Sequence, residues 1–187
     1  MKIGVFGGTF DPVHNGHINA FVEAYIALNL DQVIIVPTFV SPFKNEANSS
    51  NHDRLEMLKL AVEPYDFVTI DTSELEKGEV TYTFDTLTSL KNQYPEDELF
   101  FIIGTDHYLS FDRWSRSEEL HKLAQFVVIN RDDSELKIET PFMHLQTNVV
   151  EISSTVIRAR LKTNTEIQHL VNQNVFKFIK EHRIYET

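Results

Sequence analysis

The sequence contains no cysteine, few basic residues and no long apolar run. The lack of cysteine excludes disulfides and zinc–thiolate sites. The 17 basic residues against 28 acidic ones give a net charge of -11. This balance argues against broad binding to nucleic acids or to anionic membranes, because both require a basic face. No apolar stretch approaches the ~20 residues that span a bilayer, and no long apolar signal segment is present. We therefore expect a soluble, cytoplasmic protein with no nucleic-acid or membrane partner.

Size and composition favour one folded domain. The chain has 187 residues, of which 42% are hydrophobic and 24% are charged, as is ordinary for a globular protein with a real core. No repeat, low-complexity block or linker divides it. We expect a single domain over residues 1–187, in which residues 153–187 form a helical C-terminal part.

Short apolar runs alternate with amphipathic stretches. The runs are continuous, which is typical of parallel strands covered on both faces. They lie at residues 2–6, 33–36, 67–70, 99–103 and 126–129. Helical spacing of apolar residues follows the first run at Ile18, Phe21, Val22, Tyr25 and Leu28. This alternation predicts an α/β fold, a doubly wound, Rossmann-like parallel sheet with helices on both faces and a short C-terminal helical region.

Two local features are less regular. Ser115 and Glu118 have the spacing of a capping box, which predicts the start of a helix. Residues 142–152 have the composition of strands, and the chain after them is expected to form short helices.

The loop after the first predicted strand carries the most chemistry. Gly7 and Gly8 permit close backbone approach, and His14 and His17 stand where the first helix should begin. At this spacing both imidazoles can face one point beside the positive end of the helix, which suits a triphosphate. A plain tight turn is the alternative for the glycines. Metal ligation is the alternative for the histidines, but the glutamate and spacing of a metalloprotease helix are missing and no third ligand is evident.

A second segment, ISSTVIR, lies far along the chain at residues 152–158. Ser153 and Ser154 precede an apolar helical pattern and are good N-cap residues. Arg158 follows about one turn later, so hydroxyls, free backbone N–H groups and a guanidinium could form a second phosphate site. The alternative is a plain helix cap with a solvated arginine.

Taken together, these motifs resemble those of a known family. GGTFDPVHNGH resembles the (G/S)xFDPxHxGH signature of the HIGH-type nucleotidyltransferases, and ISSTVIR resembles their ISSTxIR motif. GEVTYTFDTL, FIIGTD and the region of Trp114 resemble stretches of the bacterial nicotinate mononucleotide adenylyltransferases. One departure is Phe43, which replaces the usual histidine of that family beside Lys44.

The resemblance implies a reaction and roles for the residues. Adenylyl transfer from ATP to nicotinate mononucleotide would give nicotinate adenine dinucleotide and pyrophosphate. Mg²⁺ would bind mainly through the ATP phosphates, with no dedicated protein metal site. The implied catalytic residues are His14, His17, Lys44 and Arg158. The implied ATP-binding residues are Gly7, Gly8, Thr9, Phe10, His14, His17, Gly104, Asp106, Ile152, Ser153, Ser154 and Arg158. The implied contacts to the mononucleotide are Lys44, Thr83, Trp114 and Arg131.

Three alternatives remain open at this stage. The acceptor could be nicotinamide mononucleotide or phosphopantetheine, although His14 stands where phosphopantetheine adenylyltransferases usually carry threonine. The chain could also be a nucleotide-binding regulator without turnover. The sequence leaves the oligomeric state open, a homo-oligomer included.

Overall fold

The computed structural model describes residues 1–39, 47–130, 136–147 and 150–186. Its centre is a six-stranded sheet in the order β3-β2-β1-β4-β5-β6, in which every pairing is parallel. The strands are β1 (Lys2–Gly8), β2 (Gln32–Pro37), β3 (Val68–Ile70), β4 (Glu98–Gly104), β5 (Gln125–Ile129) and β6 (Met143–Leu145). The predicted doubly wound parallel sheet is confirmed.

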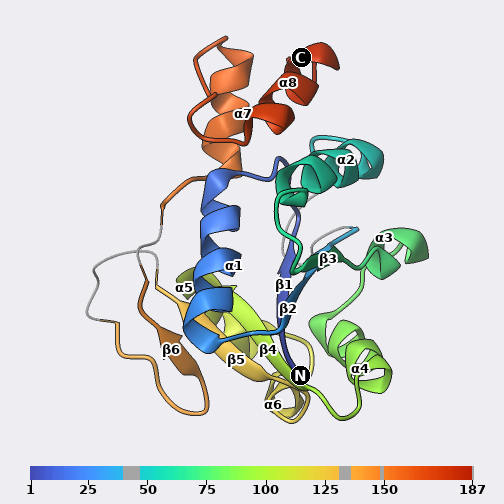
Figure 1. Ribbon diagram of the computed structural model, residues 1–187, viewed down its shortest axis with the longest axis vertical. Helices are drawn as coiled ribbons and strands as arrows, with labels where there is room; N and C mark the ends of the chain where they lie inside the picture. Colours follow the sequence, from blue (N-terminus) through green and yellow to red (C-terminus); the bar gives the residue numbers. More distant parts are fainter. Residues whose placement is uncertain (40–46, 131–135, 148–149, 187) are drawn as a thin grey trace.

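Helices follow the strands and cover both faces of the sheet (Figure 1). They are α1 (Asn15–Leu28), α2 (Asn51–Val62), α3 (Ser73–Lys77), α4 (Thr83–Gln93), α5 (Thr105–Leu109), the 3-10 helix η1 (Phe111–Arg113), α6 (Ser117–Leu120), α7 (Ser154–Lys162) and α8 (Gln173–Glu181). No helix among the described residues is both long enough and apolar enough to cross a bilayer.

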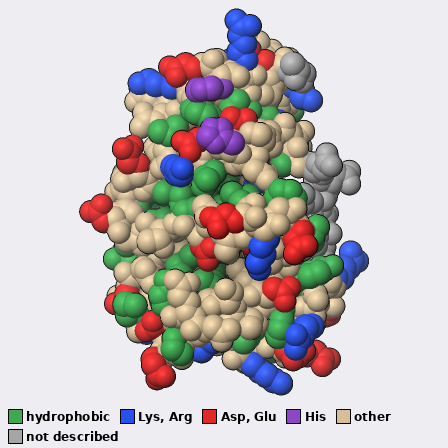
Figure 2. Space-filling model, turned by 90° about the vertical axis from the view of Figure 1, so that its right-hand side faces the viewer, with side chains coloured by type: hydrophobic (Ala, Val, Ile, Leu, Met, Phe, Trp, Pro, Cys, Tyr) green, Lys and Arg blue, Asp and Glu red, His purple; other side chains and the backbone are tan. Residues whose placement is uncertain are grey.

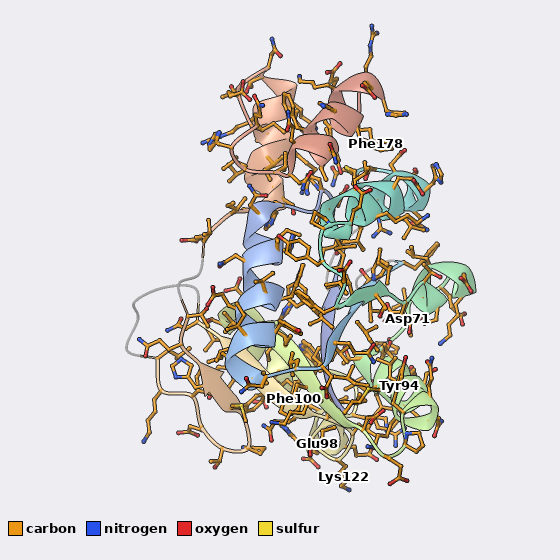
Figure 3. All side chains as sticks on the ribbon, viewed as in Figure 1. Asp71, Tyr94, Glu98, Phe100, Lys122 and Phe178 are labelled. Carbon is orange, nitrogen blue, oxygen red and sulfur yellow. The ribbon has the colours of Figure 1, made fainter. Side chains whose placement is uncertain are left out.

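The strands bury both faces, which explains their continuous apolar sequences. Alternate residues of one strand enter different cores: Ile34 and Val36 face α4 and α6, whereas Val33 and Ile35 face α1 and α2. Phe100 of β4, labelled in Figure 3, belongs to the core on the side of α1 and α2.

The C-terminal helices share a core with the sheet. Ile157 and Leu161 of α7 and Val175 and Ile179 of α8 lie in the same cluster as Ile35. Helix α8, on which Phe178 is labelled in Figure 3, packs against α2. Figure 1 shows that α7 and α8 stand beyond the end of the sheet where β1 passes into α1.

Two local predictions need correction. The capping box at Ser115 and Glu118 is wrong, because α6 begins at Ser117 and its N-cap residue is Arg116, in a left-handed conformation (φ 56°) without a side-chain capping bond. Arg116 instead forms an ion pair with Glu119, with Nε–Oε1 at 2.7 Å. Within the predicted strand region 142–152, only β6 is a strand among the described residues.

Charge is spread over the surface seen in Figure 2. On this face, basic side chains lie among acidic ones around the outline, and hydrophobic side chains show between them. This distribution fits the acidic net charge of -11.

Candidate active site

A large cavity opens at the carboxyl ends of β1 and β4. These two strands are neighbours in the sheet, although β2 and β3 separate them in the chain. The order in which successive strands are added therefore reverses between them, and such a switch point is where open α/β sheets bind ligands. The cavity has a volume of about 740 Å³. Its wall includes every described residue of the predicted site: Gly7, Gly8, Thr9, Phe10, His14, His17, Thr83, Gly104, Asp106, Trp114, Ile152, Ser153, Ser154 and Arg158.

The two histidines form a stacked pair at the start of α1. Their ring centroids lie 3.6 Å apart at an interplanar angle of 17°. The backbone N–H of His17 donates to Nδ1 of His14 at 3.3 Å, and the backbone N–H of His14 donates to Nδ1 of His17 at 3.2 Å. Because both Nδ1 atoms accept, each neutral ring carries its proton on Nε2. The pair therefore holds two Nε2–H donors next to a helix N-terminus.

Segment 152–158 meets the first loop directly. Ser154 Oγ donates to the carbonyl of Pro12 at 2.9 Å, and Arg158 Nη1 donates to the carbonyl of Asp11 at 2.6 Å. Arg158 Nη2 donates to Oγ1 of Thr155 at 3.1 Å. Ser153 is the N-cap residue of α7, but the predicted side-chain cap is wrong, since its hydroxyl makes no capping bond. Ser154 and Arg158 therefore join the two segments.

Asp11 is a functional candidate that the sequence reasoning missed. Its side chain is 4% exposed. Burial raises the pKa of its carboxyl, but hydrogen bonds from Ser49, Tyr185 and Asn48 outweigh burial and hold that pKa below its ordinary value. Asp11 is therefore a buried carboxylate, and Arg158 Nη1 lies 3.9 Å from its Oδ2. The only sequence signal was its place inside the segment GGTFDPVHNGH.

Arg54 of α2 was also missed. It is fully buried, and it donates from Nη1 to the carbonyl of Thr9 at 2.6 Å and from Nη2 to the carbonyl of Phe39 at 3.1 Å. Burial lowers the pKa of Arg54, and the negative charge of Asp11 opposes that shift. Arg54 thus ties the loop after β1 to the loop after β2. Nothing in the sequence around Arg54 predicts that it links two loops.

Two glycines are required by packing. A Cβ on Gly8 would lie 2.9 Å from the ring of Phe10, and a Cβ on Gly16 would lie 2.8 Å from the carbonyl oxygen of Val150. A Cβ on Gly7 would meet nothing closer than 3.7 Å. Neighbouring protein atoms therefore leave no room for a side chain at Gly8 and Gly16, whereas Gly7 borders the open cavity.

The opposite wall of the cavity is aromatic and contains a buried acid. Trp114 is 9% exposed, and its ring packs at 5.4 Å from that of Phe111. It also lines the cavity, so it is both a core residue and a wall residue. Glu74 lines the cavity as well and accepts a hydrogen bond from Thr86 Oγ1. Burial raises the pKa of Glu74.

Some predicted site features cannot be placed. Lys44, Phe43 and Arg131 lie outside the described residues. Among the residues that are described, no three His, Asp or Glu side chains form a group that could hold a metal ion.

Comparison with known proteins agrees with this arrangement. The model of the cytidylyltransferase-like family matches residues 5–160. The chain is 38% identical over 188 aligned positions to a probable nicotinate-nucleotide adenylyltransferase of Bacillus licheniformis, covering 100% of this chain and 99% of the relative. It is 37% identical to the nicotinate-nucleotide adenylyltransferase of Bacillus subtilis, with the same coverage.

A solved structure supports the fold. The nicotinic acid mononucleotide adenylyltransferase of Plasmodium falciparum, complexed with NaAD, is similar with a TM-score of 0.80 at 21% identity, over 99% of this chain and 97% of that one. The extent of the family match and the full-length identity to the bacillary proteins show that this chain belongs to the cytidylyltransferase-like family and, within it, to the nicotinate-nucleotide adenylyltransferases.

Proposed function

We propose that this chain transfers the adenylyl group of ATP to nicotinate mononucleotide, giving nicotinate adenine dinucleotide and pyrophosphate. The observation that carries the proposal is the junction of the two motif segments in one cavity. His14 and His17 from one segment and Arg158 from the other line the same cavity at the switch point of the sheet.

The chemistry requires positioning rather than a protein nucleophile. The phosphate monoester of the mononucleotide attacks the α-phosphorus of ATP, a bond forms to that phosphorus, and pyrophosphate leaves with the bonding electrons. The Nε2–H groups of His14 and His17 donate to phosphate oxygens and stabilise the charge that grows during this displacement. Arg158 holds the β- and γ-phosphates, which become the leaving group.

The residue set fits Mg²⁺ that is held mainly by ATP. Magnesium keeps several of its waters and takes few protein ligands when phosphates are present. The absence of an acidic cluster among residues 1–39, 47–130, 136–147 and 150–186 is compatible with this mode of binding. When bound, the ion neutralises phosphate charge. The Nε2–H donors and Arg158 would orient the phosphates beside the ion and stabilise the charge that grows during the displacement.

The aromatic wall supports a flat acceptor. Trp114 offers a ring face on which a nicotinate ring can stack, and Thr83 stands at the start of α4 on the same cavity. Lys44 and Arg131 are proposed to contact the mononucleotide by resemblance to the family. Gly104 and Asp106 are proposed to border the adenosine, with Asp106 accepting from a ribose hydroxyl.

Pyrophosphate release tests the proposal. The protein is incubated with Mg²⁺ and ATP, and nicotinate mononucleotide, nicotinamide mononucleotide or phosphopantetheine is offered separately. We expect release with nicotinate mononucleotide above the other two. Faster release with either rival would reassign the acceptor, and ATP binding without release for all three would identify a nucleotide-binding regulator.

A further inference from the structure

Tyr185, which follows α8, reaches the loop after β1. Its side chain is 7% exposed, and its hydroxyl donates to Oδ1 of Asp11 at 2.7 Å, across 174 positions of sequence. The backbone of Tyr185 is left-handed (φ 70°). A bulky residue holds that strained conformation only where its surroundings impose it. The contact is therefore a built feature of the fold.

Several donors converge on the carboxylate of Asp11. Ser49 Oγ donates to Oδ1 at 2.6 Å, beside the Tyr185 hydroxyl, and the backbone N–H of Asn48 donates to Oδ2 at 2.7 Å. Burial raises the pKa of the Tyr185 hydroxyl far above its ordinary value, so this group stays neutral. Tyr185 thus stabilises the buried carboxylate without adding a charge to the site.

Asp11 in turn holds Arg158 in two ways. Its carbonyl accepts from Nη1 at 2.6 Å, and its Oδ2 lies 3.9 Å from the same nitrogen. The orientation of Asp11 therefore sets the position of the guanidinium, whose planar fork tolerates little rotation when it binds phosphate.

We propose that Tyr185 is a positioning residue for ATP binding. Tyr185 acts on Arg158 through Asp11, and Ser49 has the same role because it donates to the same carboxylate oxygen. This inference rests on the proposed function, because it takes Arg158 as a ligand of the ATP phosphates. It assigns the segment after α8 to the nucleotide site, although that segment lies outside both motif segments of the sequence.

A purely structural role for Tyr185 makes a different prediction. Removing its hydroxyl would then lower thermal stability and would affect both substrates alike. A positioning role places the loss on ATP, because the network ends on Arg158, which is proposed to hold the ATP phosphates, whereas Trp114 and Thr83 are proposed to hold the acceptor. The two roles therefore differ in how KM for ATP and KM for the mononucleotide respond.

The test uses Tyr185→Phe, Ser49→Ala and Arg158→Lys, with Tyr65→Phe as the matched control. Tyr65 packs against the same hydrophobic core through its ring contact with Phe21. For each variant, KM for both substrates and kcat are measured by pyrophosphate release, the Kd of Mg-ATP by calorimetry, and the melting temperature by circular dichroism.

We expect Tyr185→Phe to raise KM and Kd for ATP about 5- to 20-fold, a part of what a hydrogen bond to a charged group contributes. KM for the mononucleotide should stay within about two-fold, as should every constant of Tyr65→Phe. In the Arg158→Lys background, Tyr185→Phe should have little further effect on ATP, because coupled residues are not additive.

Full additivity with Arg158→Lys, or an unchanged Kd for ATP in Tyr185→Phe, would overturn the inference. If Tyr185→Phe does not fold, Ser49→Ala decides, since it removes a donor to the same oxygen from a half-exposed loop residue. Failure of the unmodified protein to bind Mg-ATP would instead reject the proposed function, and with it this inference.

Discussion

The carbonyl of Asp11 accepts a hydrogen bond from Nη1 of Arg158 at 2.6 Å, although 147 positions separate the two residues. This contact joins the loop after β1 to α7 at the mouth of the cavity. It converts two motif segments, each of which has an ordinary explanation when considered alone, into one site.

Replacing His17 by asparagine should slow turnover by about 10²–10³. The amide oxygen of asparagine can still accept the bond that Nδ1 of His17 accepts from the backbone of His14, but the Nε2–H donor is lost. Single-turnover rates measure the effect, and circular dichroism checks the fold. The exposed His52 of α2 supplies the control His52→Asn. A rate for His17→Asn close to that of the unmodified protein would remove His17 from the mechanism.

Arg158→Lys should weaken ATP binding about 10-fold or more, because hydrogen bonds to charged groups contribute about 1.5–3 kcal/mol each. A lysine cannot reach Asp11 and Thr155 while presenting a planar fork to phosphate. Calorimetry with Mg-ATP measures the change. Arg160→Lys, on the same helix but outside the cavity wall, is the matched control. Equal effects of the two substitutions would mean that charge near α7, and not the fork of Arg158, matters.

Gly16→Ala should mainly lower folding stability, whereas Gly7→Ala should mainly lower ATP affinity. A Cβ on Gly16 would lie 2.8 Å from the carbonyl of Val150, so we expect a loss of about 1–3 kcal/mol of folding free energy. A Cβ on Gly7 has room in the fold but borders the cavity, so Gly7→Ala should keep its melting temperature and lose ATP affinity. Thermal melts and calorimetry distinguish the two, and a stable Gly16→Ala would show that the Val150 segment can move away.

Glu74→Gln should become more stabilising, relative to the unmodified protein, as pH rises from about 4 to 8. Burial raises the pKa of Glu74 above its unfolded value, so the folded state binds more protons in the window between the two values. The contribution of Glu74 to the stability of the unmodified protein therefore falls as pH rises through that window. Glutamine stays neutral and can still accept from Thr86.

Glu76→Gln is the control for this prediction. Glu76 lies exposed on the same helix and accepts a hydroxyl hydrogen bond from Thr72, and its substitution changes the net charge by the same amount. Melting temperatures are recorded for all three proteins over the pH range. A Glu74→Gln curve parallel to that of the unmodified protein would mean that Glu74 does not titrate in this window.

Nicotinate mononucleotide should quench the fluorescence of Trp114, the single tryptophan of the chain. A pyridinium ring stacked on an indole is an electron acceptor, and the cavity wall places Trp114 within reach of a ligand. The titration is compared with Mg-ATP alone, for which we expect a smaller change. Calorimetric binding of the mononucleotide without any change in fluorescence would place the acceptor elsewhere.

The sequence by itself determined the parallel sheet and marked the two motif segments that line the cavity. Continuous apolar runs specify strands that are buried on both faces, and the spacing of His14 and His17 places both rings at one helix start. These signals are local, because each one involves residues that lie close together in the sequence. The failed capping box at Ser115 shows the limit of local signals, since the ion pair between Arg116 and Glu119 and the packing of Leu120 move the start of the helix.

Tertiary structure alone decided what holds the site together. Nothing local marks Arg54 as the link between two loops, or Tyr185 as the partner of Asp11. Each of these contacts joins residues that meet only when the sheet has formed and α2 and α8 have packed on it. A buried carboxylate is stable only when hydrogen-bond donors lie within reach of it. Those distances, and the burial itself, depend on how the folded elements pack and cannot be inferred from the spacing of residues along the chain.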